Sequence, residues 1–582
     1  MNATPGAIPH GGDRVADALQ AHGVRQIFTL CGGHISPILA ACKARGMRII
    51  DVRNEATAVF AADAAARLSG IPGVAAVTAG PGITNTITAL KNAQLAQSPL
   101  LLIGGAAPTA LQGRGALQDI DQRPLVAPHV KRFFKVTRVR DLGTAVAQAL
   151  ALAQEGVPGP VFVETPVDLL YDEASIRQWY ADAAGKGRSL GERALRWYLN
   201  RHVRRMLAGS ADTTPPQAAT VAVPRAPAAA LQQAAAALAR AQRPLLVIGS
   251  QTVVQAKEVQ RLAAAVTRLG IPVYLSGMAR GLLGREHPLL RRHARRQALR
   301  ESDCVLLAGV PCDFRLDYGR HVRRGATLIA ANRSAREARL NRRPDVAAIG
   351  DAGLFLQALA AAAAAQDRSD WLATLATREA AREAEIDAQA AVAGEHVNPL
   401  ALLRTLERLA APDAILVADG GDFVGTASYV LHARAPLSWL DPGAFGTLGV
   451  GAGFAIGAAT VQPARETWVL WGDGASGYGL VEFDTCVRHG LPVIALIGND
   501  ASWMQIAREQ VKMLGDDVAT VLARTDYHAV AKGLGAEGIL VQRADEVEPA
   551  LRQAQQLAAA GRPVLVNVWL ERTAFREGSL SM

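Results

Sequence analysis

A strand, loop, helix and strand near the C-terminus constrain the fold of this chain more than any other feature. The apolar segment Thr467–Trp471 ends at Gly472-Asp473-Gly474, the helix-length stretch Glu482–His489 follows, and the apolar segment Val493–Ile497 ends before Asn499-Asp500. Two buried strands joined by a helix predict a βαβ unit with parallel strands. Asp473 and Asp500, 27 positions apart, then emerge at the same carboxyl edge of the sheet, where open α/β sheets hold ligands.

This edge predicts a site for magnesium and a diphosphate. Mg²⁺ takes few protein ligands, prefers carboxylate oxygens and completes its shell with phosphate oxygens and water. Gly474 allows the backbone to approach a diphosphate, and the helix that follows offers its N-terminus. The alternative for Gly472-Asp473-Gly474 by itself is ordinary turn chemistry, since aspartate between glycines is common in turns.

The size and composition of the chain indicate a globular protein of three or four domains. It has 582 residues, of which 50% are hydrophobic and 20% charged. No apolar run of about 18 residues occurs, and the N-terminus lacks the layout of a signal peptide, so we expect a cytoplasmic protein. The five cysteines lack metal-ligand spacing, which favours reduced thiols over a disulfide framework.

The net charge of +10 comes largely from arginine, concentrated in Arg193–Arg205 and in Arg291–Arg300. Neither cluster is interleaved with aromatic residues or embedded in a nucleic-acid-binding signature, so no nucleic-acid partner is expected. Two explanations stay open for these clusters, solvated helix faces and phosphate recognition.

The order of apolar and helical segments predicts an α/β protein with three doubly wound parallel-sheet domains. Expected strands are Ile27–Leu30, Val74–Thr78, Leu100–Ile103 and Val161–Glu164, then Pro244–Ile248, Val273–Leu275, Cys304–Ala308 and Thr327–Ala330, and the third block contains the βαβ unit. The predicted domains are 1–185, 229–365 and 397–582, joined by an amphipathic helix and Pro-rich linker over 186–228 and by a helical connection over 366–396.

The βαβ unit resembles the diphosphate-binding motif of thiamine diphosphate (ThDP) enzymes, a GDG followed after 24 to 27 residues by an Asn-Asn or Asn-Asp pair. The resemblance implies Mg²⁺ ligands from Asp473, Asp500 and the backbone carbonyl of Ser502, with Gly474, Ala475 and Trp503 also at the cofactor. Asn is the commoner second ligand, so Asp500 departs from the pattern and adds negative charge.

The first block completes this resemblance. Glu55 follows the strand-like Ile49–Val52, and together with Thr78-Ala-Gly-Pro81-Gly-Ile-Thr-Asn85 it is similar to the pyrimidine-binding domain of the acetolactate synthase-like branch. That family implies a contact from Glu55 to N1′ of the aminopyrimidine, with Pro81 and Asn85 nearby. The alternative for Glu55 alone is a carboxylate stabilised by a helix N-terminus.

Two loops of the third block resemble further cofactor contacts. In Gly443-Ala-Phe-Gly446-Thr-Leu448, the family places the Gly446 carbonyl on the 4′-amino group and Leu448 as the wedge that bends the cofactor. In Asp419-Gly-Gly421-Asp422-Phe423, it implies backbone amides that reach the far diphosphate oxygens. A glycine-rich helix entry is the alternative for the first loop.

The reaction depends on fewer residues. Cys31-Gly-Gly-His34 and Gly115-Ala-Leu-Gln118 resemble loops above thiazolium C2, which makes His34 and Gln118 catalytic candidates, although His34 also suits a satisfied turn. End-to-end similarity, including Gly277–Arg285, Trp439–Leu448 and the tail from Arg572, is to the 2-hydroxyacyl-CoA lyase and acetolactate synthase-like family. Relatives hold ADP or part of CoA in the middle domain beside an Asp, for which this chain has Asn332.

The resemblance implies a lyase that cleaves a 2-hydroxyacyl-CoA into formyl-CoA and an aldehyde, or condenses them in reverse. It also implies acyl-CoA and aldehyde substrates and a homodimer or homotetramer with active sites between subunits. Acetolactate synthase or a benzaldehyde lyase-like acyloin enzyme is the alternative with the same site, and a non-catalytic binding paralogue is the remote one.

The segment Ser189–Ser210 predicts a basic amphipathic helix, with Ser189-Leu-Gly-Glu192 as a capping box and Gly209 as the stop. Its apolar stripe is Leu195, Tyr198, Leu199, Val203, Met206 and Leu207. Packing on the protein's own surface and contact with a membrane surface are both open for this stripe.

Overall fold

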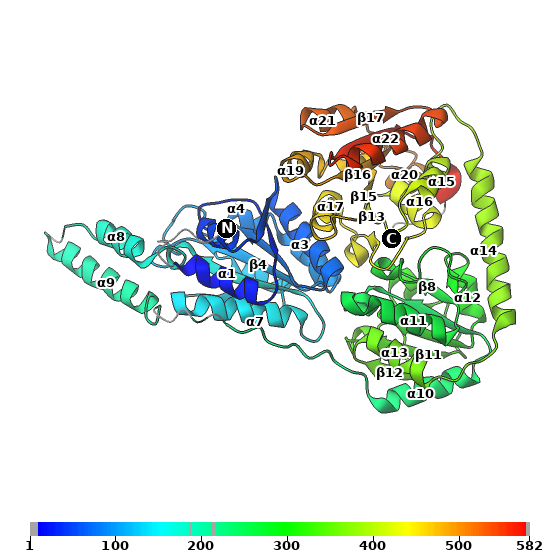
Figure 1. Ribbon diagram of the computed structural model, residues 1–582, viewed down its shortest axis with the longest axis horizontal. Helices are drawn as coiled ribbons and strands as arrows, with labels where there is room; N and C mark the ends of the chain where they lie inside the picture. The colour runs from blue at the N-terminus through cyan, green and yellow to red at the C-terminus, as the bar shows by residue number, and fades with distance from the viewer. Residues whose placement is uncertain (1–9, 187, 211–213, 215, 578–582) are drawn as a thin grey trace. The chain divides into compact units, whose positions relative to one another are not determined.

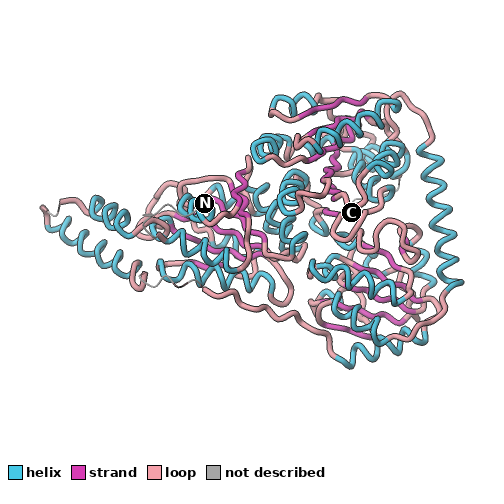
Figure 2. Tube along the Cα trace, viewed as in Figure 1, coloured by secondary structure: helices cyan, strands magenta, loops and turns pink. Residues whose placement is uncertain are grey.

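The chain folds into two compact units, and the computed structural model describes residues 10–186, 188–210, 214 and 216–577. One unit holds the chain up to Ala66 together with Ile71–Ala222, and the other holds Arg67–Gly70 and the chain from Val223. The described strands form three six-stranded sheets, and every strand pair in them is parallel. Figure 2 shows these strands in magenta among the cyan helices. The predicted fold class is confirmed.

The first unit is built on the sheet β2-β1-β3-β4-β6-β5. Its strands are β1 (Gln26–Thr29), β2 (Arg48–Asp51), β3 (Gly73–Val77), β4 (Leu100–Ala106), β5 (Phe133–Lys135) and β6 (Pro160–Pro166). Strands β3, β4 and β6 are buried at every position, as expected where helices cover both faces of a parallel sheet. The helices are α1 (Gly11–Ala21), α2 (Ser36–Ala44), α3 (Glu55–Ser69), α4 (Pro81–Thr84), α5 (Ile87–Leu95), α6 (Arg123–Val126), α7 (Leu142–Gln154), α8 (Glu173–Ala183) and α9 (Leu190–Met206).

Helix α9 begins directly after its predicted N-cap, Ser189, and ends at Met206, before the predicted stop at Gly209. The Ser189 side chain accepts a hydrogen bond from the Glu192 amide at 3.1 Å, and Gly209 has a φ of +77°. The reciprocal half of the capping box is shifted by one residue, because the Glu192 carboxylate accepts from the amide of Arg188 at 2.7 Å rather than from Ser189. Helices α8 and α9 pack together and extend away from the sheet of this unit (Figure 1).

The apolar stripe of α9 has two different surroundings. Leu199, Val203, Met206 and Leu207 are buried in the hydrophobic core of the first unit. Nearer the start of the helix, Leu195 and Tyr198 are 44% and 45% exposed. Packing on the protein's own surface is therefore correct for the C-terminal half of the helix, and the N-terminal half leaves its apolar groups in solvent.

The second unit contains two sheets, β12-β11-β10-β7-β8-β9 and β14-β13-β15-β16-β18-β17. The strands of the first are β7 (Pro244–Ile248), β8 (Val273–Leu275), β9 (Leu290–Arg291), β10 (Cys304–Ala308), β11 (Thr327–Asn332) and β12 (Val346–Ile349). Those of the second are β13 (Ile415–Asp419), β14 (Trp439–Leu440), β15 (Thr467–Gly472), β16 (Val493–Asn499), β17 (Glu537–Val541) and β18 (Val564–Trp569).

The helices of this unit cover the two sheets and connect them (Figure 1). They are α10 (Ala228–Arg240), α11 (Val259–Leu269), α12 (Arg295–Glu301), α13 (Ala352–Ala362), α14 (Ser369–Ala390), α15 (Pro399–Leu409), α16 (Asp422–Val430), α17 (Val450–Val461), α18 (Asp473–Ser476), α19 (Phe483–His489), α20 (Met504–Leu514), α21 (Tyr527–Gly533) and α22 (Val547–Ala559). Among the described residues no helix is long and apolar enough to cross a bilayer. Part of the predicted linker, 211–213 and 215, and the end of the tail, 578–582, lie outside the described residues.

The long helix α14 has its two ends in different cores of the second unit. Trp371 and Leu375 are buried in the core of the first sheet, and the Trp371 indole donates a hydrogen bond to the Pro244 carbonyl of β7 at 3.0 Å. Ile386, three to four turns further on, is fully buried in the core of the second sheet. The predicted helical connection is thus a structural bridge between the two sheets.

Candidate active site

The predicted βαβ unit is present. Strands β15 and β16 are neighbours and parallel, with Gly472 opposite Gly498, so Asp473 and Asp500 leave the sheet at the same edge. Asp473 begins α18, and its carboxylate accepts hydrogen bonds from the amide of Gly474 at 2.8 Å and from that of Ser502 at 3.2 Å. These two hydrogen bonds hold the Asp473 carboxylate in a fixed position at the ends of the strands.

The two carboxylates are desolvated and repel one another. Burial raises the pKa of Asp473. Burial, followed by the negative charges of Asp473 and Asp422, raises the pKa of Asp500 to about 7, and Arg572 offsets part of that effect. Paired carboxylates in such surroundings are stabilised by a bound cation, and hard oxygen ligands suit Mg²⁺. The residues present therefore fit the metal that the sequence implies.

Nine of the predicted cofactor residues line one cavity at this edge. They are Gly421, Asp422, Phe423, Asp473, Gly474, Ala475, Asp500, Ser502 and Trp503. Gly474 has a further reason to be glycine, because a Cβ there would lie 2.5 Å from the indole ring of Trp503. A side chain at this position would push the Trp503 ring out of the cavity wall.

Helix α16 forms the second wall of the cavity. Gly421 is its N-cap and Asp422 its first residue, so the amides at its start face the cavity and favour an anion. The Asp422 carboxylate is held by Arg508, with two hydrogen bonds of 2.8 and 2.9 Å. The positive charge of Arg508 therefore partly neutralises the Asp422 carboxylate at the edge of the cavity.

The loop with Gly446 and Leu448 is attached to the end of β13 by a buried carboxylate. Asp419 accepts hydrogen bonds from the amides of Gly449 and Gly451 and from the Trp471 indole, at 2.8 to 3.1 Å. Burial raises the pKa of Asp419 to about 6. Gly446 has a φ of +63°, which favours glycine there, and Leu448 is half-buried. Neither Gly446 nor Leu448 lines the cavity of the diphosphate half-site.

Glu55 is the first residue of α3, in the first unit, and only 8% of it is exposed. The Asn85 amide donates a hydrogen bond to its carboxylate at 3.0 Å, and Pro81 begins the short helix α4 that leads to Asn85. The second carboxylate oxygen lies beside Gly82, where a Cβ would be 3.7 Å away. The structure therefore brings together Glu55, Pro81 and Asn85, which the sequence predicts at the pyrimidine.

His34 and Gln118 both adjoin the turn between β3 and α4. The His34 ring shares a hydrogen bond of 3.0 Å with the Thr78 hydroxyl, and burial lowers its pKa. Gln118 has a φ of +61°, and its carbonyl would lie 2.7 Å from a Cβ on Gly80. A non-glycine residue in the left-handed region is strained, and such strain persists where neighbouring structure imposes it. Both catalytic candidates thus lie beside the turn that precedes Pro81.

Three supporting residues were not predicted as site residues. Asp419 fixes the loop of Leu448, Arg508 pairs with Asp422, and Arg572 donates hydrogen bonds to the Asp500 carbonyl at 3.2 and 3.4 Å. Arg572 begins the tail segment that is similar to the family, and that similarity was the sequence feature from which its role could have been predicted. No local pattern distinguishes Arg508 from the other arginines of amphipathic helices.

The folds and the two half-sites define a class of protein, the thiamine pyrophosphate enzymes. Models of that family match the chain three times, as the N-terminal TPP binding domain over residues 9–125, the central domain over 231–359 and the C-terminal TPP binding domain over 419–568. The chain belongs to this family.

Sequence identity to known proteins indicates the part of this family to which the chain is most similar. The chain is 51% identical over 581 residues to 2-hydroxyacyl-CoA lyase 2 of Bos taurus, covering 98% of this chain and 92% of the relative. It is 50% identical over 584 residues to the human protein of the same name, covering 99% and 92%. A probable acetolactate synthase of Mycobacterium bovis is 36% identical over 572 residues, covering 97% of each chain.

Proposed function

We propose that this protein is a ThDP- and Mg²⁺-dependent 2-hydroxyacyl-CoA lyase. It cleaves the bond between the carbinol carbon and the acyl carbon of a 2-hydroxyacyl-CoA, and the products are an aldehyde and formyl-CoA. The observation that carries the substrate class is the identity of 51% over nearly the whole of both chains with a 2-hydroxyacyl-CoA lyase 2, against 36% with an acetolactate synthase.

In this proposal the diphosphate half-site binds Mg²⁺ and the diphosphate of ThDP and orients the cofactor. Asp473, Asp500 and the carbonyl of Ser502 are the proposed Mg²⁺ ligands, and the amides at the start of α16 are the proposed hydrogen-bond donors to phosphate oxygens. Bound ThDP supplies the carbon nucleophile and the electron sink for the cleavage. The chain's own contribution here is charge neutralisation and a fixed cofactor position.

Glu55 is the proposed proton-holding group at N1′ of the pyrimidine. A carboxyl group at this atom shares or gives up a proton as the cofactor is activated, and the hydrogen bond from Asn85 fixes the orientation of the carboxyl group. The low exposure of Glu55 keeps water from competing for that proton.

His34 and Gln118 are the proposed groups at the substrate hydroxyl. Because burial lowers the pKa of His34, the ring is neutral near pH 7, and a neutral imidazole accepts the proton of the 2-hydroxyl group as the aldehyde leaves. Gln118 donates or accepts a hydrogen bond at the same oxygen without changing charge. The hydrogen bond shared with the Thr78 hydroxyl orients the His34 ring.

Two alternatives use the same observations. An acetolactate synthase or a benzaldehyde lyase-like acyloin enzyme would need the same half-sites, and 36% identity to a probable acetolactate synthase supports it less strongly. A non-catalytic paralogue is opposed by the presence of Glu55, Asp473 and Asp500 together with the buried supports around them.

We further propose a cytoplasmic homo-oligomer with active sites between subunits. The five cysteines, all within the described residues, are free, which suits a reducing compartment. A membrane-surface contact is proposed for the exposed start of α9, where Leu195, Trp197 and Tyr198 lie among arginines.

ADP or CoA beside Asn332 receives little support. The Asn332 side chain is buried and accepts hydrogen bonds from Gln251 at 2.9 Å and from the Ser334 amide at 2.7 Å. Its oxygen is therefore engaged within the protein. A nucleotide site in this unit is better sought elsewhere.

The test is turnover by the purified holoenzyme. A panel of 2-hydroxyacyl-CoA thioesters should give an aldehyde and formyl-CoA in equal amounts, with no release of CO₂. Pyruvate tests the alternative, since acetolactate synthesis releases CO₂. Turnover of pyruvate with CO₂ release, and none of any thioester, would replace the proposal by the synthase.

A further inference from the structure

Helix α16 presents its N-terminus to the diphosphate half-site, and its C-terminus is held by a different sheet. Gly421 and the first helical residue, Asp422, line the cavity that also holds Asp473 and Asp500, and no side chain caps the helix at Gly421. The last carbonyl groups of a helix have no partner within it and need donors from outside. At α16 these donors are two arginines, one after β8 and one after β9 in the first sheet of this unit.

Arg280 and Arg292 together bind four successive carbonyl groups at the end of α16. Arg280 donates a hydrogen bond to the Ser428 carbonyl at 2.9 Å. Arg292 donates to the carbonyls of the next three residues, Tyr429, Val430 and Leu431. The carbonyl of Ala427, the residue before Ser428, accepts from the Leu431 amide at 2.8 Å. The end of the helix is therefore fully capped, and guanidinium groups supply most of the donors.

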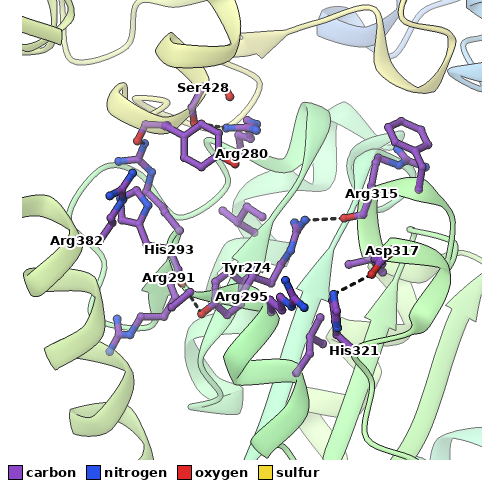
Figure 3. Close-up of a pocket in the computed structure, with 18 residues that line it drawn as sticks. Tyr274, Arg280, Arg291, His293, Arg295, Arg315, Asp317, His321, Arg382 and Ser428 are labelled. Carbon is purple, nitrogen blue, oxygen red and sulfur yellow. Dashed lines mark hydrogen bonds and ion pairs between the residues drawn. The ribbon is translucent and has the colours of Figure 1, made fainter. Parts of the chain in front are cut away.

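The segment that carries Arg280 packs against the polypeptide that follows α16. The guanidinium carbon of Arg280 lies 4.9 Å from the centroid of the Trp439 ring. Gly281 permits this approach, because a Cβ there would lie 1.9 Å from the Ala435 carbonyl oxygen. Figure 3 shows Arg280 pointing to Ser428. Packing on both sides therefore fixes the direction of its hydrogen bond to α16.

Arg292 is fixed from the side of α14. Its backbone amide donates to the Glu379 carboxylate at 3.0 Å. The Glu383 carboxylate lies 3.5 Å from its guanidinium group, but it pairs more closely with His293 at 2.7 Å and with Arg404 at 2.6 Å. Burial lowers the pKa of Arg292 to about 10, which leaves the group protonated at neutral pH. Arg292 therefore keeps its positive charge and directs it mainly to the carbonyl groups of α16.

We propose that Arg280 and Arg292 are positioning residues for the diphosphate of the cofactor, a role that rests on the ThDP site of the proposed function. Neither arginine lines the half-site cavity, so both act through α16. The nine residues of this helix span about 13 Å, and fixing its C-terminus fixes where its first amides lie. Positive charge at the C-terminus also offsets the negative end of the helix dipole, which favours an anion at the N-terminus.

A purely structural role for these arginines makes a different prediction. In that case, loss of a guanidinium group would lower the free energy of unfolding, and the molecules that remain folded would bind ThDP as tightly as the wild type does. A positioning role requires weaker ThDP binding by the folded protein, because the helix amides and the dipole are no longer held toward the diphosphate. Cofactor affinity and stability must therefore be measured separately.

The test compares two adjacent arginines. Arg292→Gln removes the guanidinium group that binds three carbonyls of α16. The matched control is Arg291→Gln, because Arg291 is also shielded from solvent and also donates to carbonyl groups, but to those of Pro288, Leu290 and Leu372. In Figure 3, Arg291 points away from Ser428. Arg280→Gln and Arg292→Lys complete the series and keep the test decisive if Arg292→Gln fails to fold.

Titration of ThDP into the full-length protein at saturating Mg²⁺ measures cofactor affinity, and thermal unfolding of the cofactor-free proteins measures stability. We expect Arg292→Gln to bind ThDP about tenfold more weakly than Arg291→Gln, which corresponds to about 1.4 kcal/mol. Arg292→Lys should lose less, since lysine keeps the charge but cannot span three carbonyl groups. Inorganic pyrophosphate with Mg²⁺ is a second probe, and its affinity should fall by a similar factor because it needs only the diphosphate half-site.

Turnover separates positioning from chemistry. Arg292→Gln should need about ten times more ThDP for half-maximal rate, and its kcat at saturating ThDP should match that of the wild type. Equal affinity of Arg292→Gln and Arg291→Gln for ThDP would overturn the positioning role and leave the proposed function intact. Failure of every thioester to react would contradict the proposed function, while the ThDP and pyrophosphate titrations would still decide the role of the arginines. A wild type that binds neither probe would overturn both.

Discussion

At the residue scale, the most direct test of the proposed chemistry is Glu55→Gln. The glutamine retains an oxygen that accepts the hydrogen bond from Asn85, so the fold and much of the ThDP affinity should survive. An amide cannot share or release the proton, and we expect turnover to fall by about 10² to 10⁴. Steady-state rates and ThDP titration measure the two effects separately. Turnover close to that of the wild type would remove Glu55 from the catalytic role.

The proposed role of Asp500 as a Mg²⁺ ligand predicts that metal binding depends on pH. Its pKa is raised to about 7, so the metal-free carboxyl takes up a proton as the pH falls through that value, and Mg²⁺ must displace the proton. The apparent affinity for Mg²⁺ should therefore decrease as the pH is lowered from about 8 to 6. Asp500→Asn has no proton to displace at this position, so its affinity should vary less over the same range.

The measurement is a Mg²⁺ titration of ThDP binding at several pH values for both proteins. Because the side-chain oxygen of asparagine can also bind a hard cation, the Asp500→Asn enzyme should remain active. An identical pH dependence in the two proteins would show that another group, such as Asp473, controls metal binding.

Single residues differ in how far the sequence predicts them. Asp473 and Asp500 could be placed together because the strand and helix lengths between them fix which edge they reach. Asp419 could not, because its role depends on a loop 30 residues away that folds back onto the strand end. The contact between Gly474 and Trp503 could not be predicted from the sequence either, because it depends on how the Trp503 ring packs.

At the element scale, α9 shows that a helical period predicts a helix but does not say what covers each part of its apolar face. Leu199 and Val203 have the same spacing as Leu195, yet they are buried in the core of the first unit and Leu195 is not. The period repeats along the helix, whereas the core beneath it covers only the second half. Capping and length were predicted from local chemistry, and burial required the tertiary structure.

The exposed half of α9 gives a membrane-binding prediction. We expect the protein to co-sediment with anionic vesicles at low salt, because Trp197 and Leu195 lie beside arginines. Changing Leu195, Trp197 and Tyr198 to serine should weaken this binding without unfolding the protein, since all three are exposed. Changes at Leu199 or Val203 are unsuitable because they would destabilise the core. No binding at low salt, or binding unaffected by the serine variant, would leave α9 with only its packing role.

Two of the strands that the sequence analysis did not predict, β9 and β14, are short and lie at sheet edges. Strands β9 and β14 have two residues each, too few for any alternation of apolar and polar positions to be recognised. They are defined by pairing with β8 and β13, which is a tertiary contact. The buried central strands β7, β8 and β10 have the predicted bounds, because continuous apolar runs identify them.

At the scale of the whole molecule, the two halves of the proposed active site lie in different units, Glu55 in the first and Asp473 with Asp500 in the second. If they join across a subunit interface, co-expression of Glu55→Gln with Asp473→Ala should restore activity. Each mixed dimer has one site with both residues intact, so a random mixture should regain about a quarter of wild-type activity. Each variant expressed alone is the control, and no gain on mixing would indicate that each site is built from one chain.

Helix α14 has a thermodynamic consequence for the second unit. With Trp371 in one core and Ile386 in the other, neither sheet unfolds without exposing apolar surface of the same helix. The core of the first sheet and the core of the second sheet, which carries the proposed metal ligands, should therefore unfold together in one cooperative step. Calorimetry should show a single transition for both, and Thr377→Pro, which breaks the helix between the two anchors, should separate it into two. A single transition in that variant would mean that contacts other than α14 join the cores.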